Sequence, residues 1–171
     1  FMLSDSPPEK DIQWSDVGVS SSNKFLQKIW NLNKLVLDRK NIRGEENEEK
    51  NFKNKIDVFI NKIDSSIQNF QFNVAIAQFY EIYRYLSDSI KKEIGNKVLI
   101  LYLTKVMKIM IPFTPHIALE CLEKLKCKDI ETWPTINQKA LEDVNINLAV
   151  QVNGKTRDVI PIKKDLIEKE V

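Results

Sequence analysis

The sequence contains few of the residues from which most active sites are built. Its four glycines are too far apart along the chain to form a glycine-rich phosphate-binding loop. With a single histidine, His116, a histidine-rich metal site is excluded, and a catalytic triad would depend on that residue alone. The most apolar stretch, residues 98–111, is 14 residues long, short of the roughly 20 that span a bilayer. We therefore expect neither a small stand-alone enzyme nor a membrane partner.

The two cysteines, Cys121 and Cys127, are predicted to be free thiols. Six residues of helix separate them by about 9 Å, beyond the roughly 7 Å limit on the Cα separation in a disulfide. Together with His116 they offer three of the roughly four ligands of a zinc site, without a CxxC pair. Reduced thiols and the lack of a signal peptide in residues 1–5 predict a cytoplasmic protein, and we expect it to be monomeric. The same residues resemble the interior of a longer chain.

The composition is that of a soluble globular domain, with 43% hydrophobic and 29% charged residues. The net charge of +2 is too small to prove a polyanionic partner. Lysine outnumbers arginine 22 to 4, and Ile, Asn and Lys are frequent, which indicates an AT-rich genome. Charge is nevertheless uneven, because residues 91–128 hold eight lysines against three glutamates.

Hydrophobic spacing predicts a mainly α protein, an up-down bundle of about five helices. The first helix, with Asp16 as its cap, has an apolar arc opposite a polar one, and Asn33 and Leu35 break this pattern. Asn73 and Thr114 are the expected caps of the third and fifth helices. The five helices are expected at about residues 18–40, 45–70, 74–92, 98–111 and 115–127.

The pattern changes to that of strands near residue 146. Apolar and polar residues alternate over 146–152, Asn153-Gly154 is a strong hairpin signal, and 159–162 is typical of the return strand. Because a lone hairpin is marginally stable in water, we expect it to begin a truncated small α/β domain. The expected organisation is a linker (1–16), the helical bundle (17–135), a second linker (136–145) and the truncated domain (146–171).

Four stretches resemble bacterial leucyl-tRNA synthetases. Residues 1–16 (FMLSDSPPEKDIQWSD) resemble the segment that leads out of the catalytic core, and 24–30 (KFLQKIW) resembles the first helix of the tRNA-binding bundle. Residues 112–118 (PFTPHIA) resemble a turn shared with the isoleucyl and valyl enzymes, and 150–158 (VQVNGKTRD) the opening hairpin of the C-terminal domain. The chain departs from the family at Lys24, often Arg there, and at Leu119-Glu120, often Glu-Glu.

The resemblance implies the tRNA-binding, anticodon-binding-type domain of a ligase that joins leucine to its tRNA using ATP, with magnesium. The HIGH-type and KMSKS-type ATP-binding motifs are absent and are expected upstream, so the fragment itself needs no cofactor and is non-catalytic. The partner would be leucine tRNA, not DNA. The alternatives are the equivalent domain of an isoleucyl or valyl enzyme, against which the Ser-Pro-Pro and Asn-Gly-Lys stretches argue, and a helical protein-interaction bundle.

The candidate RNA-binding residues lie on the solvent face of the first helix and beside the hairpin turn. Lysines on a rigid helix can bind an RNA backbone by counterion release, and the resemblance places this helix toward tRNA. The alternatives are a merely solvated helix face and, at the hairpin, charges that serve the turn and solubility. The candidates are Lys24, Lys28, Asn31, Lys34, Lys155 and Arg157.

Four conspicuous residues are expected to be structural. His116, in the first turn of a helix after a proline-rich corner, is predicted to be a hydrogen-bonded structural imidazole. Trp14, Trp30 and Trp133 could stack on bases, but core packing is the preferred interpretation.

Overall fold

The computed structural model describes residues 1–137, 145–152 and 155–163. The chain divides into two compact units, Phe1–Ile136 and Asn137–Val171.

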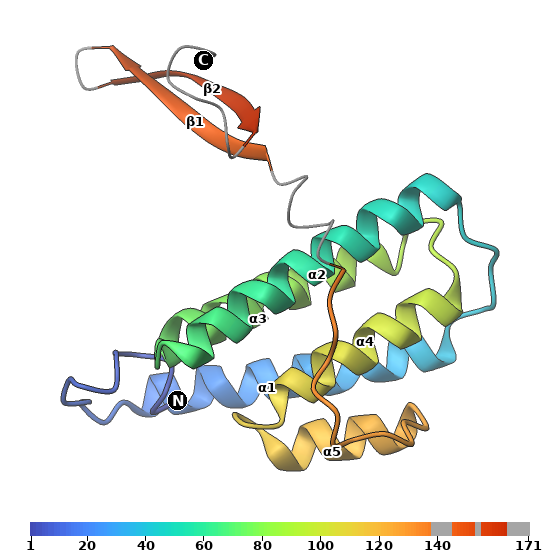
Figure 1. Cartoon of the computed structure of the whole chain (residues 1–171). Helices are drawn as coiled ribbons and strands as arrows, with labels where there is room; N and C mark the ends of the chain where they lie inside the picture. The colour runs from blue at the N-terminus through green and yellow to red at the C-terminus, as the bar shows by residue number, and fades with distance from the viewer. Residues whose placement is uncertain (138–144, 153–154, 164–171) are drawn as a thin grey trace. The chain divides into compact units, whose positions relative to one another are not determined.

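The first unit is a bundle of five helices in which successive helices run in opposite directions (Figure 1). This arrangement confirms the predicted mainly helical up-down bundle. The helices are α1 (Asp16–Asp38), α2 (Glu46–Gln68), α3 (Phe72–Ser89), α4 (Asn96–Met110) and α5 (Pro115–Lys124).

The core is built from the apolar stripes of the five helices. In α1 the buried side chains recur at helical spacing, as expected of an amphipathic helix that shows one face to the bundle. They are Phe25, Ile29, Leu32 and Val36. The two residues that break the amphipathic pattern of α1 do so in the structure as well, since Leu35 is exposed and Asn33 is buried. Neither amide atom of Asn33 has a hydrogen-bond partner among the described residues. Such an amide costs about 1–3 kcal/mol of stability.

Of the three expected helix caps, two lie at other residues and the third lacks a side-chain hydrogen bond. Ser15 caps α1 by accepting from the backbone N–H of Gly18, and Asp16, the first residue of the helix, accepts from the Trp14 indole N–H at 2.8 Å. Asn73 lies inside α3, whose N-cap position is held by Gln71 without a side-chain hydrogen bond. Thr114 occupies the N-cap position of α5 as expected, but its side chain makes no cap hydrogen bond.

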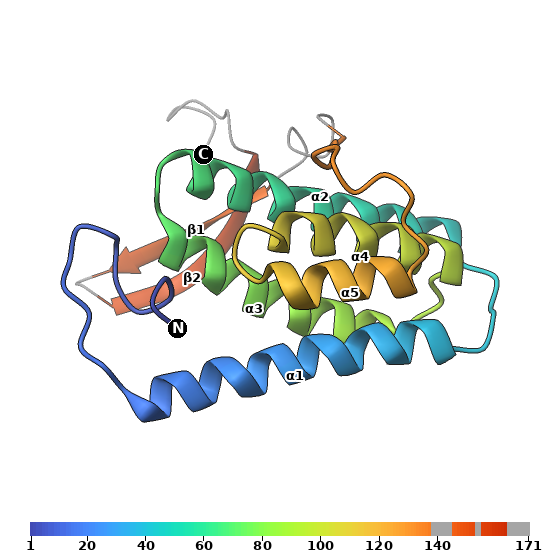
Figure 2. The same cartoon turned by 90° about the horizontal axis from the view of Figure 1, so that it is seen from below.

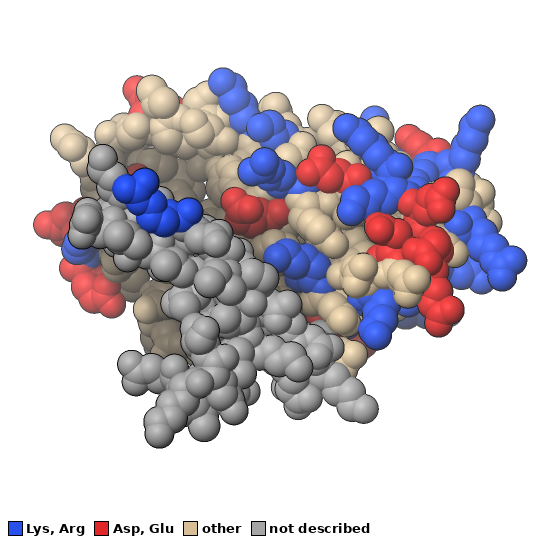
Figure 3. Space-filling model, turned by 90° about the horizontal axis from the view of Figure 1, so that it is seen from above, with Lys and Arg blue, Asp and Glu red and all other residues tan. Residues whose placement is uncertain are grey.

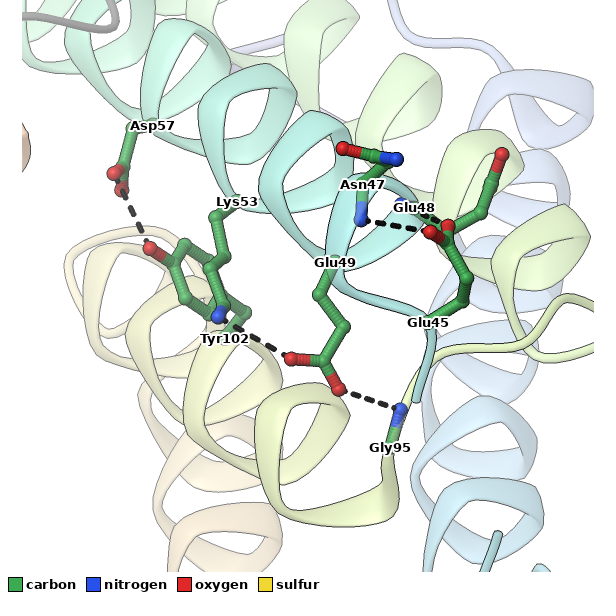
Figure 4. Close-up of polar contacts among 8 residues, drawn as sticks. All are labelled: Glu45, Asn47, Glu48, Glu49, Lys53, Asp57, Gly95 and Tyr102. Carbon is green, nitrogen blue, oxygen red and sulfur yellow. Dashed lines mark hydrogen bonds and ion pairs between the residues drawn. The ribbon is translucent and has the colours of Figure 1, made fainter. Parts of the chain in front are cut away.

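The connection between α1 and α2 meets the connection between α3 and α4. Glu45 caps α2 with its carboxylate, and its own N–H donates to the Glu93 carbonyl at 2.8 Å. One turn later Glu49 accepts from the Gly95 N–H at 3.0 Å and pairs with Lys53 at 3.3 Å (Figure 4). One row of glutamates thus starts α2 and also ties it to the beginning of α4.

A buried acid joins α2 to α4. Asp57 is 1% exposed and accepts from the Tyr102 hydroxyl at 3.3 Å (Figure 4), and the Lys105 ammonium lies 3.1 Å from its other oxygen. Burial raises the pKa of Tyr102 well above its usual value, and the nearby Asp57 carboxylate raises it further. Tyr102 therefore stays a neutral hydrogen-bond donor, and Lys105 balances the buried charge.

The two thiols differ in environment. Cys121 is fully buried in α5, and burial raises its pKa to about 11, with a further contribution from Glu120. Cys127 is half-buried, and its thiol lies 3.2 Å from the Asp129 carbonyl oxygen, to which it donates. Both are free, as predicted.

The raised pKa of Cys121 predicts a loss of stability at alkaline pH. Its thiol ionises near pH 8.5 in the unfolded chain but near 11 in the folded one, so stability is full below about pH 8.5 and falls as pH rises through 11. The complete loss corresponds to about 3 kcal/mol. Urea unfolding with a reductant between pH 7 and pH 11 measures it. The free energy of unfolding of Cys121→Ala should fall less steeply with pH, keeping only the loss above pH 10 that Tyr102 causes. If the unchanged protein and the variant lose stability in parallel, Cys121 is not the source of the loss.

The second unit contains two antiparallel strands, β1 (Asn145–Val152) and β2 (Lys155–Lys163). Val150 pairs with Asp158 and Gln151 with Thr156, so Arg157 is the extra residue of a β-bulge. The predicted Asn153-Gly154 turn and the end of the chain after Lys163 lie outside the described residues. That these strands begin a truncated α/β domain stays a prediction.

Candidate RNA-binding surface

The polar face of α1 carries four of the six candidate residues. Lys24, Lys28, Asn31 and Lys34 are all exposed, and at about 100° per residue they lie within an arc of about 120°. The opposite arc is buried in the core, which fixes the rotation of the helix. At about 1.5 Å per residue, α1 is a rigid support about 34 Å long for these side chains.

The three lysines of α1 form no ion pair with any residue that the structure describes. Within the described residues, Lys24, Lys28 and Lys34 take part in no hydrogen bond, salt bridge or ring contact. By contrast, five other lysines already have carboxylate partners: Lys53, Lys92, Lys105, Lys108 and Lys124. An external anion could therefore bind the α1 lysines without first displacing an acidic side chain.

The α2 side of the bundle offers a less favourable surface for an anion. Figure 3 shows that lysines and arginines on this side are interspersed with acidic residues. A hollow of about 380 Å³ between α2 and α3 shows the same mixture, since Lys55, Lys62 and Arg84 line it together with Glu81 and Asp88. Among the described helices, α1 is accordingly the best candidate for contact with a polyanion.

The remaining two candidates belong to the second unit. Lys155 opens β2, and Arg157 is exposed at the bulge. A bulge alters the direction of a side chain relative to a regular strand, so this position is suited to an outward-pointing guanidinium. The side chain of Lys155 is outside the described part of the chain.

The structure brings together residues that the sequence analysis did not select. Asn23 and Gln27 line a groove between α1 and α5 together with Asn31 and Trp30. Across this groove the Lys124 ammonium lies 5.2 Å from the centre of the Trp30 ring. The spacing of Asn23, Gln27 and Asn31, four residues apart, is a visible signal in the sequence, but the groove itself depends on α5.

Two of the three tryptophans are more exposed than expected, and within the described residues the histidine lacks its predicted hydrogen bond. Trp14 is 70% and Trp133 41% exposed, so the prediction of core packing is wrong for both, whereas Trp30 packs against the core. Trp14 precedes α1 and has no helix face to hold it against the bundle; its ring contacts Phe1 edge-on at 5.9 Å. His116 is exposed in the first turn of α5, without the hydrogen bond predicted for it within the described residues.

The described residues contain neither a cluster of metal ligands nor a membrane-spanning helix. In residues 1–137, 145–152 and 155–163 no three His, Cys, Asp or Glu side chains lie close enough to hold a metal ion. Over the same residues no helix combines the length and the apolar character needed to cross a membrane.

A five-helix bundle whose first helix carries a row of exposed lysines, unpaired within the described part of the chain, is a helical domain suited to binding a polyanion. The family model described as "Anticodon-binding domain of tRNA ligase" matches residues 49–171. The chain belongs to this family of anticodon-binding domains.

The curated relatives are leucine–tRNA ligases. The chain is 36% identical to those of Prochlorococcus marinus and Fervidobacterium nodosum and 31% identical to that of Thermotoga maritima, over its whole length in each case. It covers 20% of the first and 22% of the other two, so it spans about a fifth of the length of these relatives. The resemblance to leucyl-tRNA synthetases is thus confirmed.

A solved structure shares the fold. It is the LeuRS agnB2 of Agrobacterium radiobacter K84 in a ternary complex with tRNA and LeuAMS, with a TM-score of 0.77 and 27% sequence identity. The match covers 98% of this chain and 23% of the other.

Proposed function

We propose that this chain is the tRNA-binding helical domain of a leucine–tRNA ligase. The observation that carries the proposal is the 36% identity to such ligases over the entire chain. The matching structure, a LeuRS in complex with tRNA, supports tRNA as the partner. In this proposal the parent enzyme joins leucine to its tRNA, and the chain helps to hold the tRNA without making or breaking bonds.

Other parts of the parent would supply the chemistry. The chain matches about a fifth of its relatives, and ATP, with magnesium, would be used in the remaining part of such an enzyme. The bundle would act as a cytoplasmic, monomeric RNA-binding module. An isoleucyl or valyl enzyme and a protein-interaction bundle are less favoured, because the relatives reported above are all leucine–tRNA ligases.

The physical basis of binding would be phosphate recognition by the α1 lysines. Each ammonium that neutralises a phosphate releases condensed counterions, so the affinity falls steeply with salt. Phosphate contacts position a nucleic acid without reading its sequence. The α1 face would therefore fix the location of tRNA, and Lys155 and Arg157 of the second unit would add contacts of the same kind.

A fluorescence-anisotropy titration tests this proposal. The chain would be titrated with leucine tRNA, with serine tRNA, which also has a long variable arm, and with an unrelated RNA duplex, each at two salt concentrations. We expect salt-sensitive binding that favours leucine tRNA. Absence of binding to all three RNAs at low salt would overturn the proposal, whereas equal binding would reduce the role of the chain to backbone contact.

A further inference from the structure

A groove between α1 and α5 lies next to the lysine-bearing face of α1. The two helices run side by side (Figure 2) and pack on each other. The groove has a volume of about 450 Å³, within the roughly 300–1,000 Å³ of pockets that hold small organic groups. Its lining consists of Asn23, Leu26, Gln27, Trp30, Asn31 and Ile117.

One wall of the groove is a row of amides. Asn23, Gln27 and Asn31 follow one another at intervals of four residues, so they lie along one side of α1, and all three are exposed. None of the three amide groups has a hydrogen-bond partner within the described residues. Each amide offers a donor and an acceptor side by side, which is the pattern that pairs with the edge of a nucleobase.

The floor of the groove is apolar and partly aromatic. Leu26, Trp30 and Ile117 are each half-buried there. The Lys124 ammonium that lies over Trp30 is also paired with Glu120 at 3.1 Å, but an exposed pair of this kind is weak and can be exchanged. A flat heterocycle with apolar faces and a polar edge matches this combination of floor and wall.

Cations flank the groove on the α1 side. Lys34 is one turn beyond Trp30, while Lys24 and Lys28 are on the adjoining polar face. A nucleotide whose base entered the groove would place its phosphates beside these ammonium groups. An apolar peptide segment would use the apolar floor but would leave the lysines without charge complementarity.

We propose that the α1/α5 groove binds an unpaired nucleobase of the RNA. The base packs on the Trp30 floor, its edge pairs with Asn23 and Gln27, and the flanking phosphates contact the α1 lysines. This inference rests on the proposed function and adds to it, because it assigns readout of an unpaired nucleotide to a surface otherwise expected to contact only the backbone. A base of duplex RNA cannot enter the groove, since it is already stacked and paired.

The first test uses two RNA hairpins of equal length and charge, one with a bulged nucleotide and one fully paired. In a Trp14→Phe/Trp133→Phe variant, Trp30 is the remaining tryptophan and reports on the groove. We expect the bulged RNA to quench Trp30 fluorescence and the paired RNA to leave it nearly unchanged. Equal responses to the two hairpins would overturn the inference.

A double substitution separates base readout from phosphate contact. Asn23→Ala/Gln27→Ala should weaken binding of the bulged hairpin about 10-fold and leave the paired hairpin unaffected, with an unchanged salt slope. The matched control is Asn47→Ala/Asn51→Ala, which removes two exposed amides at the same spacing on α2 and should change neither affinity. Alanine favours helix, so both variants should fold.

The outcomes distinguish this inference from the proposed function. Suppose that Asn23→Ala/Gln27→Ala binds both hairpins as tightly as the unchanged chain does, and that binding stays salt-sensitive. The groove then does not read a base, although the RNA-binding function stands. If neither hairpin binds at low salt, the inference about the groove fails, and the titration with leucine tRNA decides the proposed function separately. Quenching by an apolar peptide but not by the bulged hairpin would make the groove a protein-binding site and would also overturn the inference.

Discussion

Replacing Lys24, Lys28 and Lys34 together with alanine is expected to leave the bundle folded and to weaken tRNA binding roughly 10- to 100-fold near 0.1 M salt. The three side chains are exposed and unpaired among the described residues, so their loss removes no contact within the fold. Each phosphate contact contributes about 0.7–0.9 to the slope of log affinity against log salt, so the slope should decrease by about 2–3. Anisotropy titrations over a salt series measure both quantities.

A variant with the same change in charge controls for a general electrostatic effect. Lys50→Ala/Lys55→Ala/Lys62→Ala also removes three exposed lysines, all of them from α2. Both triple variants lower the formal net charge from +2 to −1. If binding depends on the α1 face, the α2 variant should retain most of the affinity and slope. Equal losses in the two variants would show that net charge alone governs binding, against the assignment to α1.

The Lys105→Met substitution is expected to reduce the free energy of unfolding by about 3 kcal/mol. It leaves the Asp57 carboxylate, 1% exposed, without the ammonium 3.1 Å away, while methionine keeps most of the side-chain volume. A buried charge that loses its cation is far more costly than an exposed one, because solvent cannot replace the interaction. Urea denaturation followed by circular dichroism gives the free energy.

The matching surface substitution is Lys92→Met. Lys92 pairs with Glu48 at 3.6 Å, and the two side chains are 49% and 44% exposed. An exposed pair of this kind contributes about 0–1 kcal/mol, so the loss should stay below that of Lys105→Met by at least about 2 kcal/mol. Similar losses in the two variants would show that Asp57 does not need the Lys105 charge in the folded protein.

The helical part of the fold could be predicted well from the sequence. The five expected ranges differ from α1–α5 by at most three residues at either end. The agreement is close because the extent of a helix depends on nearby residues, through the spacing of apolar side chains and the positions of Gly and Pro. Caps were less predictable, since Ser15 and Asp16 are both good capping residues. In the structure Ser15 caps the helix, while Asp16 accepts from the Trp14 indole N–H.

Features that depend on two distant helices could not be predicted. The lysines within the apolar stretch of α4 are visible in the sequence, but the pairing of Lys105 with Asp57 joins residues 48 positions apart. The α1/α5 groove likewise needs Ile117 opposite Leu26 and Trp30. The exposed face of α1 was predictable because a single helix determines it; its groove was not, because packing between helices determines it.

The meeting of Gly44 and Gly95 governs where the domain can accept additional sequence. A Cβ atom on Gly44 would overlap the Glu49 carboxylate and lie 2.6 Å from the Gly95 backbone nitrogen, so these two connections fit together without spare room. An insertion in the α1–α2 or the α3–α4 connection would break the contacts between them. The turn between α2 and α3 lies at the opposite end of the bundle (Figure 1). It is more open, since Phe70 in this turn has 65% of its surface exposed. Inserted modules, or new chain ends created by circular permutation, should be tolerated at that turn and not at the glycine crossing.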